Sequence, residues 1–163
     1  MDSADAEGLP RVKYPLAPLI ELESNLAVEG APVSARSDQP LVLFSHGYRG
    51  ISNQSIDLME TLASHGFIVV SPEHTGNSQA TPDDDFDTAA ANRVPDISFL
   101  IDTFFARSDT PEDVFYNRVR QRDVGVVGHS FGGMPTVGVA TGWAGAPPDP
   151  RVTAIAPISA VIQ

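Results

Sequence analysis

The chain has 163 residues, which suits a single domain, and its 42% hydrophobic and 19% charged residues are typical of a folded globular protein. Ten basic and 21 acidic residues give a net charge of −11, which disfavours nucleic-acid binding because phosphate backbones are also negative. The lack of cysteine excludes disulfides, thiolate metal sites and a cysteine nucleophile.

The N-terminal part, residues 1–40, is proline-rich and of mixed polarity, so we expect an irregular segment there, with 18–23 as one candidate strand. Residues 41–163 form the predicted domain. Its expected elements are a strand at 41–45, a helix at 52–65, a strand at 67–70, a polar loop at 73–92, a helix at 95–107, a short helix at 110–118, a strand at 124–128, a helix at 131–141 and a strand at 151–158.

Short apolar strands that alternate with amphipathic helices predict an α/β fold, with a mainly parallel sheet and helices on both faces. Ligands of such sheets bind beyond the carboxyl ends of the strands. No apolar run approaches the length that spans a membrane, and the acidic start does not resemble a signal peptide. We therefore expect a cytoplasmic location for the chain as written, or secretion if its N-terminus is truncated.

The strand at 124–128 ends in Gly128-His-Ser-Phe-Gly132, which has the G-x-S-x-G pattern of a nucleophile elbow. In an elbow, a serine lies on a tight turn between a strand and a helix, and the glycines allow a close backbone approach. Ser130 is therefore the candidate nucleophile, and Gly128, His129 and Gly132 support it. The backbone N–H of Phe131 is a candidate oxyanion donor. The alternative interpretation is a glycine-rich turn without a catalytic role.

An earlier strand, 41–45, runs into Ser45-His46-Gly47-Tyr48. In hydrolases with an elbow, the second oxyanion donor comes from the loop after an earlier strand. We expect the backbone N–H of Tyr48 to be this donor and His46 and Gly47 to support the loop. The alternative is an ordinary turn after a strand.

All four histidines precede the serine in sequence: His46, His65, His74 and His129. His46 and His129 are expected to orient loops, and His65 to end a helix. His74 is a candidate substrate contact, although a loop-orienting role is the more common one. The acidic residues of the polar loop (Asp83, Asp84, Asp85 and Asp87) lack the glycine and glutamate of an EF-hand, so a solvated loop is favoured over a calcium site.

Several spaced segments together resemble the α/β-hydrolase superfamily, and more narrowly its dienelactone-hydrolase-like and platelet-activating-factor-acetylhydrolase-like serine esterases. They are Leu41–Gly47, Leu62–Phe67, Glu73–Asn77, Gly128–Gly133 and Asp149–Val152. The resemblance implies a carboxylester hydrolase that forms an acyl intermediate on Ser130, needs no cofactor or metal, and takes a small-molecule or lipid-like ester. A dienelactone or amide hydrolase of the same superfamily, and a catalytically inactive binding module, are the alternatives.

The chain also departs from this pattern. Such enzymes place an acid and then a histidine after the serine, but only Asp149, in a proline-flanked turn, is acidic after Ser130, and no histidine follows. The resemblance therefore implies a truncated portion: a partial α/β-hydrolase fold without its first and last strands. The strand order would be 67–70, 41–45, 124–128, 151–158. Both sheet edges would be open to self-association, unless a segment near 13–22 covers one of them.

Overall fold

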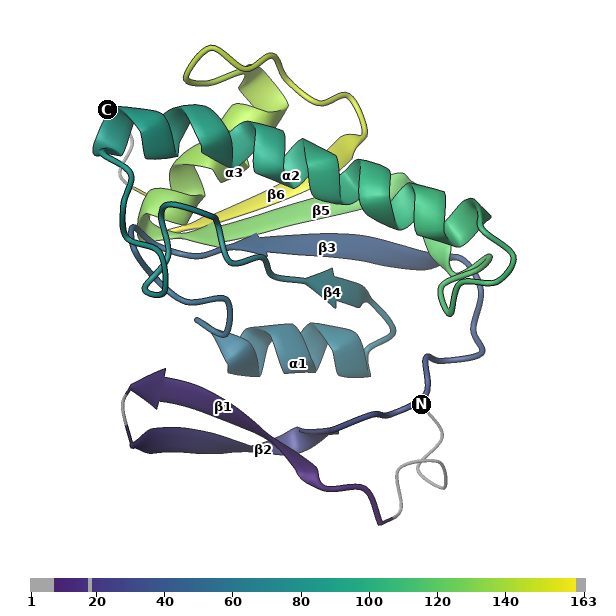
Figure 1. The fold of residues 1–163 in the computed structure, drawn as a ribbon. Helices are drawn as coiled ribbons and strands as arrows, with labels where there is room; N and C mark the ends of the chain where they lie inside the picture. The colour runs from purple at the N-terminus through teal and green to yellow at the C-terminus, as the bar shows by residue number, and fades with distance from the viewer. Residues whose placement is uncertain (1–7, 18, 161–163) are drawn as a thin grey trace.

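The computed structural model describes residues 8–17 and 19–160, and Figure 1 shows their arrangement. The strands are β1 (Arg11–Ala17), β2 (Ile20–Val28), β3 (Gln39–Ser45), β4 (Ile68–Val70), β5 (Val119–His129) and β6 (Val152–Ile158). The helices are α1 (Ile56–Ser64), α2 (Phe86–Asp109), the short 3₁₀ helix η2 (Ser130–Gly132) and α3 (Gly133–Thr141).

The central sheet has the strand order β4-β3-β5-β6, and every neighbouring pair is parallel. Helices α2 and α3 lie on one face and α1 lies on the other (Figure 1). This arrangement confirms the expected α/β class, the partial α/β-hydrolase fold and the order of its four strands. Parallel register also places Ser45, the last residue of β3, beside Gly128 near the end of β5.

The main core lies between the sheet and α2. Alternate residues of β5 point to this side, and Val124 and Val126 are fully buried there. They pack with apolar residues of β3, α2 and α3 that are themselves almost fully buried: Leu41, Leu43, Val94, Ile97, Ile101 and Val139. This core fixes the carboxyl ends of β3 and β5 against each other, where the candidate site lies.

The N-terminal segment differs from the expected irregular one. Strands β1 and β2 form an antiparallel hairpin, and only residues 20–23 of it fall within the candidate strand at 18–23. Its alternation of polar and apolar residues is a two-faced strand pattern that the prolines obscured. Among the described residues the hairpin forms a sheet of its own and pairs with neither edge of the central sheet. It packs beside α1 instead, where the Tyr14 hydroxyl donates to Glu60 at 2.9 Å.

Helix α2 begins at Phe86, well before the expected start at residue 95, so much of the predicted polar loop is helical. The Asp85 side chain caps the helix by accepting from the Thr88 N–H at 2.8 Å. Pro95 therefore lies inside the helix rather than in its first turn. Pro95 is exposed and has no N–H to donate to the carbonyl of Ala91, an exposed residue one turn earlier.

Two further expectations need correction. Residues 110–118 form turns, not a short helix, and Asp113 accepts there from the Phe115 N–H at 2.8 Å. Strand β5 begins at Val119 rather than 124, because 119–120 pair with Gln39 and Pro40 of β3. Pairing with a neighbouring strand overrides the polar sequence of that stretch. Of the helices in the described ranges, none is long and apolar enough to cross a bilayer.

Candidate active site

Ser130 lies at the turn between β5 and α3 with a φ of 55°, in the left-handed region that non-glycine residues rarely adopt. The strand ends at His129, and the chain turns through η2 directly into α3. Ser130 thus occupies a strained backbone conformation directly after the last residue of the strand.

The two elbow glycines are required by close backbone contacts. A Cβ on Gly128 would lie 2.1 Å from the Gly132 carbonyl oxygen, and a Cβ on Gly132 would lie 2.0 Å from the Ser45 carbonyl oxygen. Real Cβ atoms do not approach so closely. The turn after β5 can therefore pack against the end of β3 only because both positions lack a side chain.

The loop after β3 lies against the serine. A Cβ placed on Gly47 would be 3.7 Å from the Ser130 Cβ, so the two loops touch at this point. Gln54 joins them: its Oε1 accepts from the Gly47 N–H at 2.7 Å, and its Nε2 lies 2.8 Å from His129 Nδ1. The structure thus brings together the residues of the predicted elbow and those of the predicted oxyanion loop.

Aromatic side chains surround this junction. The Phe131 ring is buried and lies edge-on to Tyr48, with 5.3 Å between the ring centroids. Phe86, from the start of α2, lies 5.1 Å from the Phe131 ring and is 51% exposed, and Trp143 lies 6.1 Å away. The surface beside Ser130 is therefore apolar and aromatic on the α2 side.

His46 is fully buried and forms hydrogen bonds within and beside the loop after β3. Its Nδ1–H donates to the Gly47 carbonyl at 2.8 Å, and its Nε2 accepts from the His74 N–H at 3.3 Å. Burial, and then the nearby positive charge of Arg93, lower the pKa of His46 to about 4, so the ring is neutral at physiological pH.

His74 is also buried, with 2% of its surface exposed, and both ring nitrogens have partners. Nδ1 lies 2.6 Å from Asp96 Oδ2, and Nε2 lies 3.1 Å from the Ser45 hydroxyl. Burial lowers the pKa of His74 against the opposing hydrogen bond to Asp96, so the neutral ring donates to Asp96 and accepts from Ser45. Both ring nitrogens of His74 are therefore occupied by partners within the described residues.

The serine, histidine and aspartate of this buried chain are linked in the same order as a catalytic triad. Ser45, however, is only 1% exposed and also accepts a hydrogen bond from Arg93 Nη1 at 3.0 Å. The Ser45 hydroxyl is thus enclosed by protein, whereas Ser130 is partly exposed.

Arg93, on α2, was not expected from the sequence, yet it is the largest fully buried side chain of the described residues. Nη1 donates to the His46 carbonyl at 2.7 Å, and Nη2 donates to the side-chain oxygen of Asn77 at 2.6 Å. A signal for it exists: Arg93 is spaced four and eight residues from Ile97 and Ile101, on the buried stripe of α2. The expected start of this helix at residue 95 hid that pattern.

No base contacts the candidate nucleophile: among residues 8–17 and 19–160, no side chain forms a hydrogen bond with the Ser130 hydroxyl. The same described ranges contain no group of three or more histidine, cysteine or acidic residues that could hold a metal ion. The acid and the general base of a triad are therefore not assembled within this part of the chain.

Asp149, the one acidic residue after Ser130, serves a different purpose. Its carboxylate is buried and accepts from Arg151 at 2.7 and 2.9 Å and from the Ser98 hydroxyl at 2.8 Å, which ties the start of β6 to α2. The hydrogen bonds from Arg151 lower the pKa of Asp149 to about 2.

This low pKa predicts a loss of stability in acid. The pKa of an aspartate in an unfolded chain is about 3.9. The ionised Asp149 therefore contributes fully to the free energy of unfolding above about pH 4. As the pH falls toward 2, this free energy should drop by about 2 kcal/mol. Urea unfolding between pH 5 and 2 measures it. The fall should shrink in Asp149→Asn and persist in the surface control Glu112→Gln; an equal fall in Asp149→Asn would contradict this assignment.

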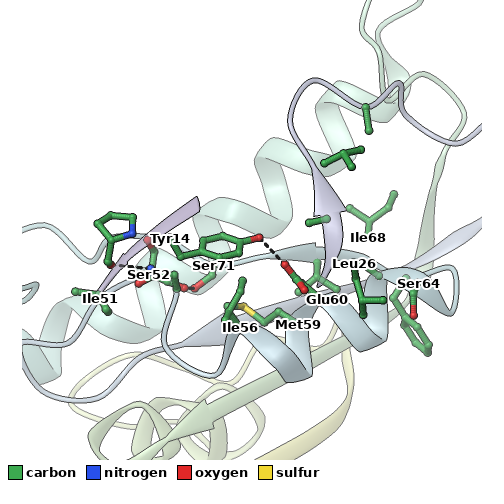
Figure 2. A pocket seen from close by; sticks show the side chains of 18 of the residues that line it. Tyr14, Leu26, Ile51, Ser52, Ile56, Met59, Glu60, Ser64, Ile68 and Ser71 are labelled. Carbon is green, nitrogen blue, oxygen red and sulfur yellow. Dashed lines mark hydrogen bonds between the residues drawn. The ribbon is translucent and has the colours of Figure 1, made fainter. Parts of the chain in front are cut away.

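A large cavity lies elsewhere, between the β1–β2 hairpin, α1 and β4, and has a volume of about 1640 Å³. Figure 2 shows Leu26 of β2, Ile56 and Met59 of α1 and Ile68 of β4 around it. Ser130 does not line this cavity, although Ile51 and Ser52, which follow the loop after β3, do. The cavity is thus a separate apolar site on the α1 face of the sheet.

The chain is similar to known proteins in sequence and in fold. The family model described as Chlorophyllase matches residues 28–162. The chain is also similar to the solved structure of a ferulic acid esterase from Streptomyces cinnamoneus, with 30% sequence identity, a TM-score of 0.61 and 79% of this chain covered. Only 38% of that esterase is covered, so the chain spans well under half of its length. The chain matches none of the curated proteins. The expected resemblance to esterases of the α/β-hydrolase type is confirmed.

Proposed function

Since this chain belongs to the chlorophyllase family, we propose that it is the nucleophile-bearing portion of a serine hydrolase that cleaves carboxylic esters. The observation that carries this proposal is the left-handed Ser130 at the end of β5, with the Gly47 loop packed against it. A dienelactone or amide hydrolase would use the same elbow, and the esterase similarity favours the ester reaction.

In the proposed reaction, the Ser130 hydroxyl oxygen attacks the ester carbonyl carbon while a general base takes its proton. The carbonyl oxygen becomes an oxyanion, which accepts hydrogen bonds from the N–H groups of Tyr48 and Phe131. Collapse of this intermediate breaks the bond to the alcohol, which leaves with the proton from the base. Water then hydrolyses the acyl-Ser130 ester by the same steps.

The general base and its acid are proposed to lie in sequence beyond this chain. Two observations support this: no described side chain forms a hydrogen bond with the Ser130 hydroxyl, and the chain covers 38% of the ferulic acid esterase. Translation of the gene past Gln163 is expected to show an aspartate followed by a histidine. A stop codon directly after Gln163 would contradict the truncated interpretation.

The substrate is proposed to be a small or lipid-like ester with an apolar acyl group. The aromatic surface formed by Tyr48, Phe86 and Phe131 beside the serine supports such a group. The net charge of −11 disfavours polyanionic substrates. The similar solved structure is named a ferulic acid esterase, and the acyl group of a ferulic acid ester is aromatic.

A fluorophosphonate probe, which reacts with activated serines, tests the proposal. The longest translated product that contains this chain should be labelled at the peptide with Ser130, and Ser130→Ala should remove the label. Ser45→Ala, which changes the buried serine, should leave labelling in place if the protein folds. A label that maps to another residue, or no label on the folded longer product, would refute the esterase proposal.

A ligand-binding module without catalysis is the second candidate, and the apolar cavity favours it. Its volume of about 1640 Å³ exceeds the usual size of a small-molecule pocket, about 300–1,000 Å³, and would admit a long aliphatic chain. Displacement of a fluorescent apolar dye by a fatty acid tests this candidate. Leu26→Glu, which changes a lining residue, should weaken displacement, and unchanged affinity in this variant would count against the cavity.

Self-association through open sheet edges is also proposed. Strand β6 ends the sheet, every residue after Val152 in it is exposed, and the described part of the chain supplies no neighbour on its outer side. Sedimentation velocity should show dimers or larger species, and the Ile155→Lys variant should contain a smaller fraction of them. A monomer at all concentrations would overturn the proposal.

A further inference from the structure

The peptide group between Gly47 and Tyr48 connects the buried network to the proposed chemistry. Its N–H is the proposed oxyanion donor, and its carbonyl is the Gly47 oxygen. Three donors converge on that oxygen: His46 Nδ1 at 2.8 Å, the Gly50 N–H at 3.0 Å and Arg93 Nη2 at 3.2 Å. A carbonyl held from three directions has little freedom to rotate.

The N–H direction follows from the carbonyl direction. The described residues contain no cis peptide bond, so the Tyr48 N–H points opposite to the Gly47 carbonyl within one plane. A group that fixes the carbonyl direction therefore also fixes the direction of the Tyr48 N–H, in a loop that packs against Ser130 at Gly47.

Of the three donors, Arg93 carries a full charge and comes from a distant part of the chain. Its side chain is 0% exposed, and no carboxylate within the described residues forms a salt bridge with it. A buried cation without a paired anion is costly. Burial lowers the pKa of Arg93 to about 10, which still leaves it charged at neutral pH.

Charge adds a second effect beyond direction. A cation at an amide carbonyl draws electron density toward the oxygen and makes the N–H of the same amide a better donor, since hydrogen bonds in a chain polarise one another. The guanidinium also lies 5.1 Å from the centroid of the Phe131 ring, the residue that supplies the other proposed oxyanion donor. One side chain thus contacts both the carbonyl of the Gly47–Tyr48 peptide group and the ring of Phe131.

We propose that Arg93 is a positioning residue of the oxyanion hole. Through the Gly47 carbonyl, Arg93 orients and polarises the Tyr48 N–H, and its guanidinium packs against the ring of Phe131. This proposal rests on the proposed function of Ser130. A merely structural Arg93 would affect stability alone, whereas a positioning Arg93 changes the reaction of a folded protein.

Two measurements test it on Arg93→Lys and Arg93→Met, with Arg107→Met as the matched control. Arg107 is also an α2 arginine, but it is partly exposed and pairs with Asp113. The first measurement is the backbone amide resonance of Tyr48 in this chain by NMR. It should move in both Arg93 variants by more than in Arg107→Met, and this result does not depend on whether Ser130 reacts.

The second measurement is the rate of fluorophosphonate reaction in the longer translated product, resolved into probe affinity and maximal rate. Loss of one oxyanion donor lowers rates by about 10²–10³-fold. Because Arg93→Met keeps the donor and only misplaces it, we expect its maximal rate to fall by about 10- to 100-fold. Its affinity for the probe should stay within about twofold of the wild-type value. Arg93→Lys keeps the charge but not the planar fork, so about tenfold is expected.

The outcomes separate the two proposals. An unreactive wild-type protein would refute the esterase function. The Tyr48 amide resonance would still show whether Arg93 determines the orientation of the Tyr48 N–H. A reactive wild type with folded Arg93 variants that react equally fast would overturn the positioning role. If Arg93→Met does not fold, as judged by circular dichroism, Arg93→Lys decides by the same two measurements.

Discussion

Replacement of Ser130 by glycine is expected to abolish ester hydrolysis and at the same time to stabilise the fold. Loss of a catalytic serine lowers turnover by about 10⁴-fold or more. The left-handed conformation of Ser130 costs a residue with a side chain about 1–2 kcal/mol, which glycine does not incur. Glycine also makes the unfolded chain more flexible, which lowers the free energy of unfolding by about 0.4–1 kcal/mol. A net gain of about 0.5–1 kcal/mol follows.

Ser130→Ala is the matched control, because it removes the same hydroxyl but keeps a Cβ at the strained position. Both variants should be inactive in the longer translated product, and only the glycine variant should unfold at higher urea concentration. Equal stability of the two variants would show that the backbone at residue 130 stores no strain. Hydrolysis that survives in both would instead remove Ser130 from the mechanism.

The positions of the turn at Ser130 and of the loop after β3 could be predicted from the sequence because their signals are local. Gly128 and Gly132 stand at fixed spacing around Ser130, and each is needed for a contact within a few residues or with the adjacent strand. The apolar strands before both loops place them at the carboxyl ends of neighbouring parallel strands, which the register of β3 and β5 confirms.

The network beneath the loops could not be predicted in the same way. Arg93 reaches the Gly47 carbonyl from 46 residues away, and Gln54 joins His129 across 75 residues. Neither contact leaves a periodic pattern, because side-chain partners on different elements depend on tertiary packing. The predicted start of α2 at Pro95 also hid Arg93, because the helix begins at Phe86 and Arg93 lies on its buried face.

The other large effect is expected from Gly128→Ala, which should destabilise the fold by about 3 kcal/mol or more. The added Cβ would lie 2.1 Å from the Gly132 carbonyl oxygen and 2.4 Å from Thr136 Oγ1. Neither atom can yield: Thr136 is fully buried and its hydroxyl already donates to that carbonyl at 2.8 Å, and Gly132 is pressed against the end of β3. The turn would have to open, which moves Ser130 away from the Gly47 loop.

Gly125→Ala on the same strand separates this steric conflict from the general effect of a methyl group. A Cβ at Gly125 would lie 3.4 Å from Val42 Cγ2, an ordinary contact, so its stability should change by less than about 1 kcal/mol. Urea unfolding of both variants, with fluorophosphonate labelling of the longer product, measures the difference. Equal stability of the two variants would mean that the elbow relaxes freely. In that case the close packing of β3 and β5 would not be what holds the serine in place, and the strained conformation of Ser130 would need another cause.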